Sequence, residues 1–198
     1  NMANKQVSDE LPVKIILIGD LGVGKTTLTF KYVEYSGELK EILHKSIIFQ
    51  DRKIKMTFQD TCGAEQMATV TSALYQNAVA CIFVYDVTNN ESLLNLNNWV
   101  GELRRFGHEK GNIPKALCGN KNDLESKIND ADLQAFLEKN PMKDFKVSAT
   151  TGEGIDAMFN AILPEAIEES IKQLKEKGKP IPPPLKKKGS KGGKCFIL

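Results

Sequence analysis

Val13-Lys-Ile-Ile-Leu-Ile-Gly-Asp-Leu-Gly-Val-Gly-Lys-Thr26 is the stretch of this chain that decides its fold. Its first six residues are an apolar run, which indicates a buried strand, and its last eight match the pattern G-x-x-x-x-G-K-[ST]. The residues from Lys25 onward have helical composition. A strand that feeds a helix through such a turn is typical of a phosphate-binding loop, because backbone N–H groups and the positive end of the helix dipole attract phosphate.

In a loop of this kind, Lys25 would neutralise the outer phosphates and the Thr26 hydroxyl would bind Mg²⁺. The pattern arises by chance in roughly one chain of this size per few hundred, so a glycine-rich turn used only for packing is the alternative at this point. The predicted phosphate-binding residues are Asp20, Leu21, Gly22, Val23, Gly24, Lys25, Thr26 and Thr27.

Further strand-like runs alternate with helical patterns, which specifies a mostly parallel sheet with helices on both faces. One pair of runs, residues 46–50 and 53–59, is separated only by Asp51 and Arg52 and therefore predicts a hairpin, with one antiparallel strand at the sheet edge. The apolar centre of the second run is 54–58, and the other runs cover residues 80–85, 116–118 and 145–147.

The chain divides into a flexible N-terminus at 1–11, one folded domain at 12–177 and a basic tail at 178–198. The last helix is predicted from about residue 156 through 177, ending at Gly178. Beyond it, four prolines cannot continue a helix and a Lys/Gly segment cannot build a core, so residues 179–198 are interpreted as a flexible linker.

Charge is unevenly placed along the chain. Residues 172–198 hold nine lysines against the single acid Glu176, a charge of +8, which leaves −6 for the rest of a chain whose total is +2. An acidic body with a basic tail argues against nucleic-acid binding and for a tail that meets an anionic surface. We find no signal sequence and no run of roughly 20 apolar residues, so a cytosolic protein is expected.

Three short motifs at predicted strand ends carry a resemblance to a known family: Asp60-Thr-Cys-Gly63, Asn120-Lys-Asn-Asp123 and Ser148-Ala149. Together with the phosphate loop they resemble the Ras superfamily of small GTPases, and Tyr85-Asp-Val-Thr88 with the helix around Trp99 is similar to Rab sequences. The resemblance covers about residues 12–177. It implies the P-loop NTPase Ras-like fold, an α/β fold with a six-stranded, mostly parallel sheet, one antiparallel edge strand and five helices.

The resemblance also implies roles for these residues in binding GTP or GDP with Mg²⁺. Asp60 would hold Mg²⁺ through water, alongside Thr26, and the Gly63 amide would meet the terminal phosphate. Asp123 would accept hydrogen bonds from N1–H and the 2-amino group of guanine, which adenine cannot offer, and this disfavours an ATPase or nucleotide kinase. The remaining residues implied at the guanine are Asn120, Lys121, Ser148, Ala149 and Thr150.

Two departures from the family pattern point to slow hydrolysis. Ala64 stands where relatives carry the glutamine that orients the attacking water, and losing that positioning raises the barrier by roughly 2 to 4 kcal/mol. Leu21 adds bulk beside the terminal phosphate and would crowd the water and any inserted arginine. Lys25, Gly63 and Ala64 are thus the positions that bear on catalysis.

Other departures concern the first switch and the base. The segment 35–45 lacks the threonine that relatives use to close over Mg²⁺, for which Ser46 or Ser36 is an imperfect substitute. Thr150 replaces a lysine. Gly37 falls where an aromatic residue commonly packs by the base, and Tyr35 is the candidate replacement.

Cys195-Phe-Ile-Leu198 is a C-a-a-X box whose final Leu favours geranylgeranyl, and with the lysines before it supplies two membrane signals. A charged tail without lipid is the alternative. We therefore expect a monomeric, membrane-anchored switch of vesicle traffic that hydrolyses GTP slowly and meets effectors and exchange factors through residues 35–47 and 61–76. The alternative is a hydrolysis-deficient or poorly nucleotide-binding scaffold.

Overall fold

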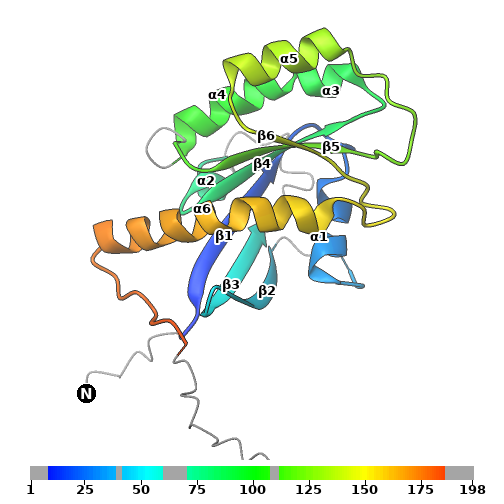
Figure 1. Ribbon diagram of the computed structural model, residues 1–198. Coiled ribbons are helices and arrows are strands. Elements are labelled where there is room, and N and C mark those ends of the chain that lie inside the picture. The colour runs from blue at the N-terminus through cyan, green and yellow to red at the C-terminus, as the bar shows by residue number, and fades with distance from the viewer. Residues whose placement is uncertain (1–8, 39–41, 60–70, 108–111, 186–198) are drawn as a thin grey trace, which may run out of the picture.

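The structure of the chain, a computed structural model, describes residues 9–38, 42–59, 71–107 and 112–185 (Figure 1). The strands are β1 (Leu11–Ile18), β2 (Ile42–Phe49), β3 (Arg52–Gln59), β4 (Ala80–Asp86), β5 (Lys115–Asn120) and β6 (Lys143–Lys146). The helices are α1 (Lys25–Val33), α2 (Thr71–Tyr75), α3 (Asn90–Leu94), α4 (Leu96–Phe106), α5 (Asp130–Lys139) and α6 (Ile155–Glu176).

One six-stranded sheet, in the order β2-β3-β1-β4-β5-β6, organises the described residues. β1 lies near its centre, and Ile15 is paired with Phe58 of β3 on one side and Ala80 of β4 on the other, both in parallel register. Only β2 runs antiparallel, at the edge. The predicted sheet is therefore confirmed, and since its parallel strands point the same way, their carboxyl ends share one edge.

The predicted hairpin is also present. Gln50 and Asp51 connect β2 to β3 with φ angles of 46° and 58°, a left-handed turn whose twist matches that of the flanking strands. β2 begins earlier than predicted, at Ile42, because Leu43 is buried and pairs with Phe58.

Helices cover both faces of the sheet (Figure 1). α1 and α6 pack on one face, where the rings of Tyr32 and Phe159 stack with centroids 3.7 Å apart. α2, α3, α4 and α5 pack on the other. α3 and α4 are interrupted only at Asn95 and together form the helix predicted around Trp99, which gives five helices within the described residues, as expected. None of the helices in the described part of the chain is long and apolar enough to span a membrane.

The segment after α6, residues 179–185, lies against the hairpin. α6 ends as predicted, with Gly178 at φ 60°. Arg52 Nη1 then donates to the Pro182 carbonyl oxygen at 2.8 Å, the Leu185 N–H donates to the Asp51 carbonyl oxygen at 2.6 Å, and Pro182 is buried. This part of the predicted flexible linker is thus packed on the fold, because prolines hold it extended beside β2 and β3. The rest of the tail, 186–198, lies outside the described residues.

Replacing Arg52 with Ala should loosen this segment. The substitution removes a charge-assisted hydrogen bond, and such bonds contribute about 1.5–3 kcal/mol, so hydrogen exchange of the Leu185 amide should accelerate at least tenfold. Lys53→Ala, at the exposed neighbouring position, is the matched control and should leave that exchange unchanged. Equal exchange in the wild type and Arg52→Ala would show that the contact contributes nothing.

Candidate nucleotide site

The loop between β1 and α1 has a backbone that only glycine tolerates at several positions. Gly22 and Gly24 have φ angles of 80° and 94°, and a Cβ at Gly19 would lie 2.1 Å from the Val84 carbonyl oxygen of β4. α1 begins at once, because the Leu28 N–H donates to the Gly24 carbonyl oxygen at 2.9 Å. The backbone of the turn therefore lies close to the sheet, and the N-terminus of α1 lies directly beside this turn.

Lys25 is buried, and its ammonium group lies within this turn. Nζ donates to the carbonyl oxygens of Gly19 at 2.8 Å and Asp20 at 2.7 Å. Thr26 follows in the first turn of α1. Leu21, in contrast, is 72% exposed at the tip of the loop. The structure thus places a cation inside a glycine turn and a bulky apolar side chain at its rim.

Asn120, the last residue of β5, connects three segments of the site. Its Nδ2 donates to the Val23 carbonyl oxygen at 2.8 Å, and its Oδ1 accepts from the Ala149 N–H at 3.0 Å. The fit is close, since a Cβ at Gly24 would lie 2.3 Å from Nδ2. The motifs at 19–26, 120–123 and 148–149, predicted separately, are therefore in direct contact.

Lys121 adopts φ 66° and forms an ion pair with Asp86 at the end of β4, with Nζ and Oδ2 2.6 Å apart. The Thr88 N–H and hydroxyl both donate to Asp86 Oδ1, at 2.9 and 2.8 Å. Burial alone would raise the pKa of Asp86, but the hydrogen bonds from Lys121 and Thr88 and the Lys121 charge outweigh it and hold the pKa below its usual value.

The segment after β6 curls back beneath the 120–123 motif. The Asn122 N–H donates to the Val147 carbonyl oxygen at 3.0 Å, and the buried Ser148 hydroxyl accepts from the Thr151 N–H at 3.0 Å. Asp123 and Thr150 are exposed beside these buried partners. The arrangement leaves a carboxylate facing solvent at the edge where the phosphate loop lies.

A pocket of about 410 Å³ adjoins this edge, and Thr27, Tyr35, Ser36 and Ala149 are among the residues that line it. A Cβ at Gly37 would lie 2.6 Å from the Tyr35 hydroxyl oxygen, so the Tyr35 hydroxyl lies against the backbone of Gly37. Tyr35 therefore lines the same pocket as Ala149 of the 148–149 motif and Thr27 of the phosphate loop, and its role beside the base stays a prediction.

The other predicted switch residues are placed less favourably or fall outside the described residues. Ser46 pairs with Lys55 in the middle of β2, roughly 13 Å along the strand from Ile42, so it is removed from the phosphate loop. Asp60, Gly63 and Ala64 lie outside the described residues, as does most of the segment 61–76.

Comparison with known proteins agrees with this geometry. A sequence profile described as the Ras family matches residues 14–168. The chain belongs to the Ras family. It is 32% identical over 195 residues to the Ras-related protein Rab-2B of Dictyostelium discoideum, covering 94% of this chain and 92% of that protein. It is 35% identical to the GTP-binding protein ypt3 of Schizosaccharomyces pombe (77% and 74% covered) and to the Ras-related protein RABA1c of Arabidopsis thaliana (82% and 79%).

The chain is therefore a Rab-like small GTPase, a hydrolase whose ligands are GTP, GDP and Mg²⁺. The loop fits such ligands. Gly19 and Gly24 let its backbone lie against Val84 and Asn120, a close approach that a side chain would prevent. The Lys25 ammonium group, held within the turn, supplies positive charge for phosphate oxygens. The Thr26 hydroxyl would hold Mg²⁺, which usually takes only one or two protein ligands and completes its shell with phosphate and water.

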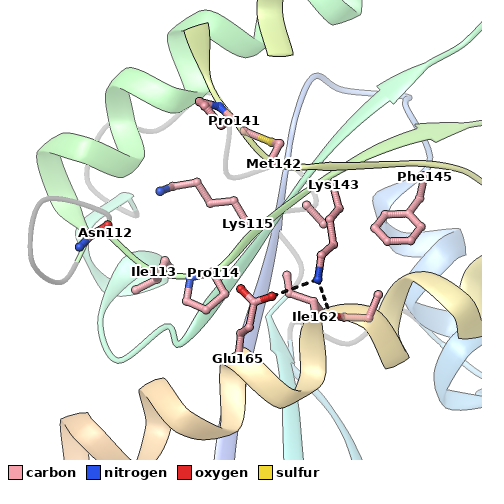
Figure 2. Close-up of a pocket in the computed structure, with 12 residues that line it drawn as sticks. Asn112, Ile113, Pro114, Lys115, Pro141, Met142, Lys143, Phe145, Ile162 and Glu165 are labelled. Atoms are coloured by element: carbon pink, nitrogen blue, oxygen red, sulfur yellow. Dashed lines mark hydrogen bonds and ion pairs between the residues drawn. The ribbon is translucent and has the colours of Figure 1, made fainter. Parts of the chain in front are cut away.

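A second pocket, of about 480 Å³, lies at the opposite end of the sheet (Figure 2). It is bounded by the beginnings of β5 and β6 and by α6, and Lys143 crosses it to contact Glu165 at 3.1 Å. The nucleotide motifs lie at the other ends of these strands, so this pocket is separate from the Ras-family site.

Sequence reasoning missed several residues that support the site. Asp86 and Thr88 were noted only as similar to Rab sequences, yet Asp86 pairs with Lys121 and Thr88 donates hydrogen bonds to Asp86. Asn95 and Trp99 contact the carboxylate of Asp20. The sequence did offer one signal for these two donors. Asp20 is an acidic residue inside a phosphate loop, and such a side chain needs hydrogen-bond donors elsewhere in the fold.

The Asp86–Lys121 pair predicts a loss of stability in acid. Because the folded-state pKa of Asp86 is depressed, its contribution is present above the unfolded pKa of about 3.9 and is lost as the pH falls through the lower folded value. In Asp86→Asn, the fall in melting temperature between about pH 6 and pH 3 should be smaller than in the wild type. The control Asp51→Asn, in the exposed hairpin turn, should show the same fall in melting temperature as the wild type. If the melting temperatures of all three proteins depended on pH in the same way, the Asp86–Lys121 pair would not be a source of the acid sensitivity.

Proposed function

We propose that this GTPase is a membrane-anchored switch of vesicle traffic whose own hydrolysis of GTP is slow. The observation that carries the nucleotide part is the contact of Asn120 with both the phosphate loop and Ala149, which gathers the phosphate and base motifs into one site. Exchange of GDP for GTP would reshape residues 35–47 and 61–76 and so change the surface offered to effectors and exchange factors.

Slow hydrolysis is supported by two positions. Ala64 carries no side-chain amide, so it cannot orient an attacking water as glutamine does in relatives. Leu21 projects from the tip of the phosphate loop with 72% of its surface exposed, where it would obstruct an arginine supplied by an activating protein. Asp123, exposed at the same edge, is available to accept hydrogen bonds from guanine.

Single-turnover GTP hydrolysis tests this proposal. Ala64→Gln should accelerate hydrolysis about 30- to 900-fold, because the restored amide positions the water and lowers the barrier by roughly 2 to 4 kcal/mol, at 1.36 kcal/mol per tenfold in rate. Ala64→Leu, which adds comparable bulk without an amide, is the matched control and should not accelerate it.

The competing function is a non-catalytic scaffold that stays GTP-bound or binds nucleotide poorly. Its motivation is the same pair of departures, Ala64 and Leu21. An unchanged rate in Ala64→Gln, with GTP still bound at the end of the assay, would favour the scaffold over a damaged catalyst.

Membrane attachment rests on Cys195 and the lysines that precede it. A single lipid binds a bilayer marginally, and each lysine near an anionic leaflet adds about 1 kcal/mol, so the two signals together give stable anchoring. In cells, Cys195→Ser should move the protein from the membrane fraction to the soluble fraction. Ser190→Ala, in the same tail but outside the C-a-a-X box, is the control and should leave the distribution unchanged; a membrane-bound Cys195→Ser variant would rule the lipid anchor out.

A further inference from the structure

Asp20 is an anion at the second position of a loop that receives phosphate. Its main-chain carbonyl oxygen accepts from Lys25 Nζ at 2.7 Å, so the backbone of this residue helps to place the ammonium group. Its carboxylate would repel bound phosphates if it turned toward them, since like charges a few ångströms apart interact unfavourably. The orientation of this side chain therefore matters for ligand binding.

Two neutral donors hold that carboxylate, one on each oxygen. Asn95 Nδ2 donates to Asp20 Oδ2 at 2.7 Å, and Trp99 Nε1 donates to Asp20 Oδ1 at 2.8 Å. Both distances are typical of hydrogen bonds to an ionised acceptor. Asn95 and Trp99 lie four positions apart, so they project from the same face of the α3–α4 junction.

The two donors are themselves held firmly. The Asn95 N–H donates to the Glu91 carbonyl oxygen at 2.9 Å, which secures it at the end of α3. Trp99 packs against the apolar cluster on the α3–α4 face of the sheet, which includes the buried residues Leu96 and Val100. The Asp20 side chain thus connects the loop to a rigid part of the fold.

We propose that Asn95 and Trp99 are positioning residues for the phosphates of a guanosine di- or triphosphate, and that they act through the carboxylate of Asp20. This inference rests on the proposed nucleotide site and deepens it. The two residues keep the carboxylate directed at the helix junction, so that the loop presents its N–H groups and Lys25 to the ligand. Trp99 is also the only tryptophan in the chain, so its emission reports on this contact.

A double-mutant cycle tests the proposal on full-length protein loaded with a fluorescent GDP analogue excited directly. Trp99→Phe keeps an aromatic ring and removes the N–H; it should speed GDP dissociation about tenfold, the effect of losing one hydrogen bond to a charged group. Asp20→Ala should speed it by a similar factor. Because Trp99 acts through Asp20, the double variant should be no faster than Asp20→Ala alone.

Two further variants keep the cycle interpretable. Asn95→Ala removes the second donor without touching the tryptophan, and it should also speed dissociation, even if Trp99→Phe proves too unstable to purify. Asn98→Ala, exposed on the same helix, is the matched control and should leave the rate within about twofold, as expected of a surface substitution. Rates within twofold of the wild type for Trp99→Phe and Asn95→Ala, or additive effects in the cycle, would overturn the proposal.

A measurement without nucleotide separates this inference from the proposed function. Hydrogen exchange of residues 19–24 should be faster in Asn95→Ala than in the wild type, and the Trp99 emission should shift in Asp20→Ala. Wild-type protein that fails to bind GDP would refute the proposed function, yet these two readouts would still decide whether the contact orders the loop. Unchanged exchange and emission would refute the positioning role.

Discussion

The side-chain amide of Asn120 is the interaction on which the rest of the site depends. Only 1% of this residue is exposed, and its two ends meet opposite partners, the Val23 carbonyl and the Ala149 N–H. A carboxylate could not donate to the first partner and an aliphatic side chain could satisfy neither, which would leave buried polar groups at a cost of about 1–3 kcal/mol each. The residue type follows from this geometry, as does glycine at position 24, where no Cβ fits.

Much of the fold could be predicted from local pattern. The alternation of apolar runs with helical segments indicated the parallel sheet, and the two-residue link at Asp51 and Arg52 indicated the hairpin. Since parallel strands end at a shared edge, motifs placed after them had to converge. β6 was predicted slightly late, at 145–147 instead of Lys143–Lys146, because this edge strand is mostly exposed and lacks an apolar run.

The contacts that local pattern could not supply join residues far apart in the chain. Asp20 and Trp99 are 79 positions apart, and nothing in the periodicity of either segment specifies their pairing. Residues 179–185 have the composition of a linker, yet they pack on the hairpin, since an extended proline segment has little entropy left to lose on docking. Ser46 was a plausible switch residue from spacing alone, and only the strand register removes it.

The contact between residues 179–185 and the hairpin also determines how the fold bears mechanical load. A pull on the C-terminus reaches the edge of the sheet before it reaches α6, and it meets the Leu185–Asp51 hydrogen bond first and the Arg52–Pro182 bond second. Hydrogen bonds that are loaded one after another break singly, and each contributes only its own small net free energy to the resistance. Tension on the tail would therefore load the turn between β2 and β3 first, and it would reach α6 only after these two hydrogen bonds had broken.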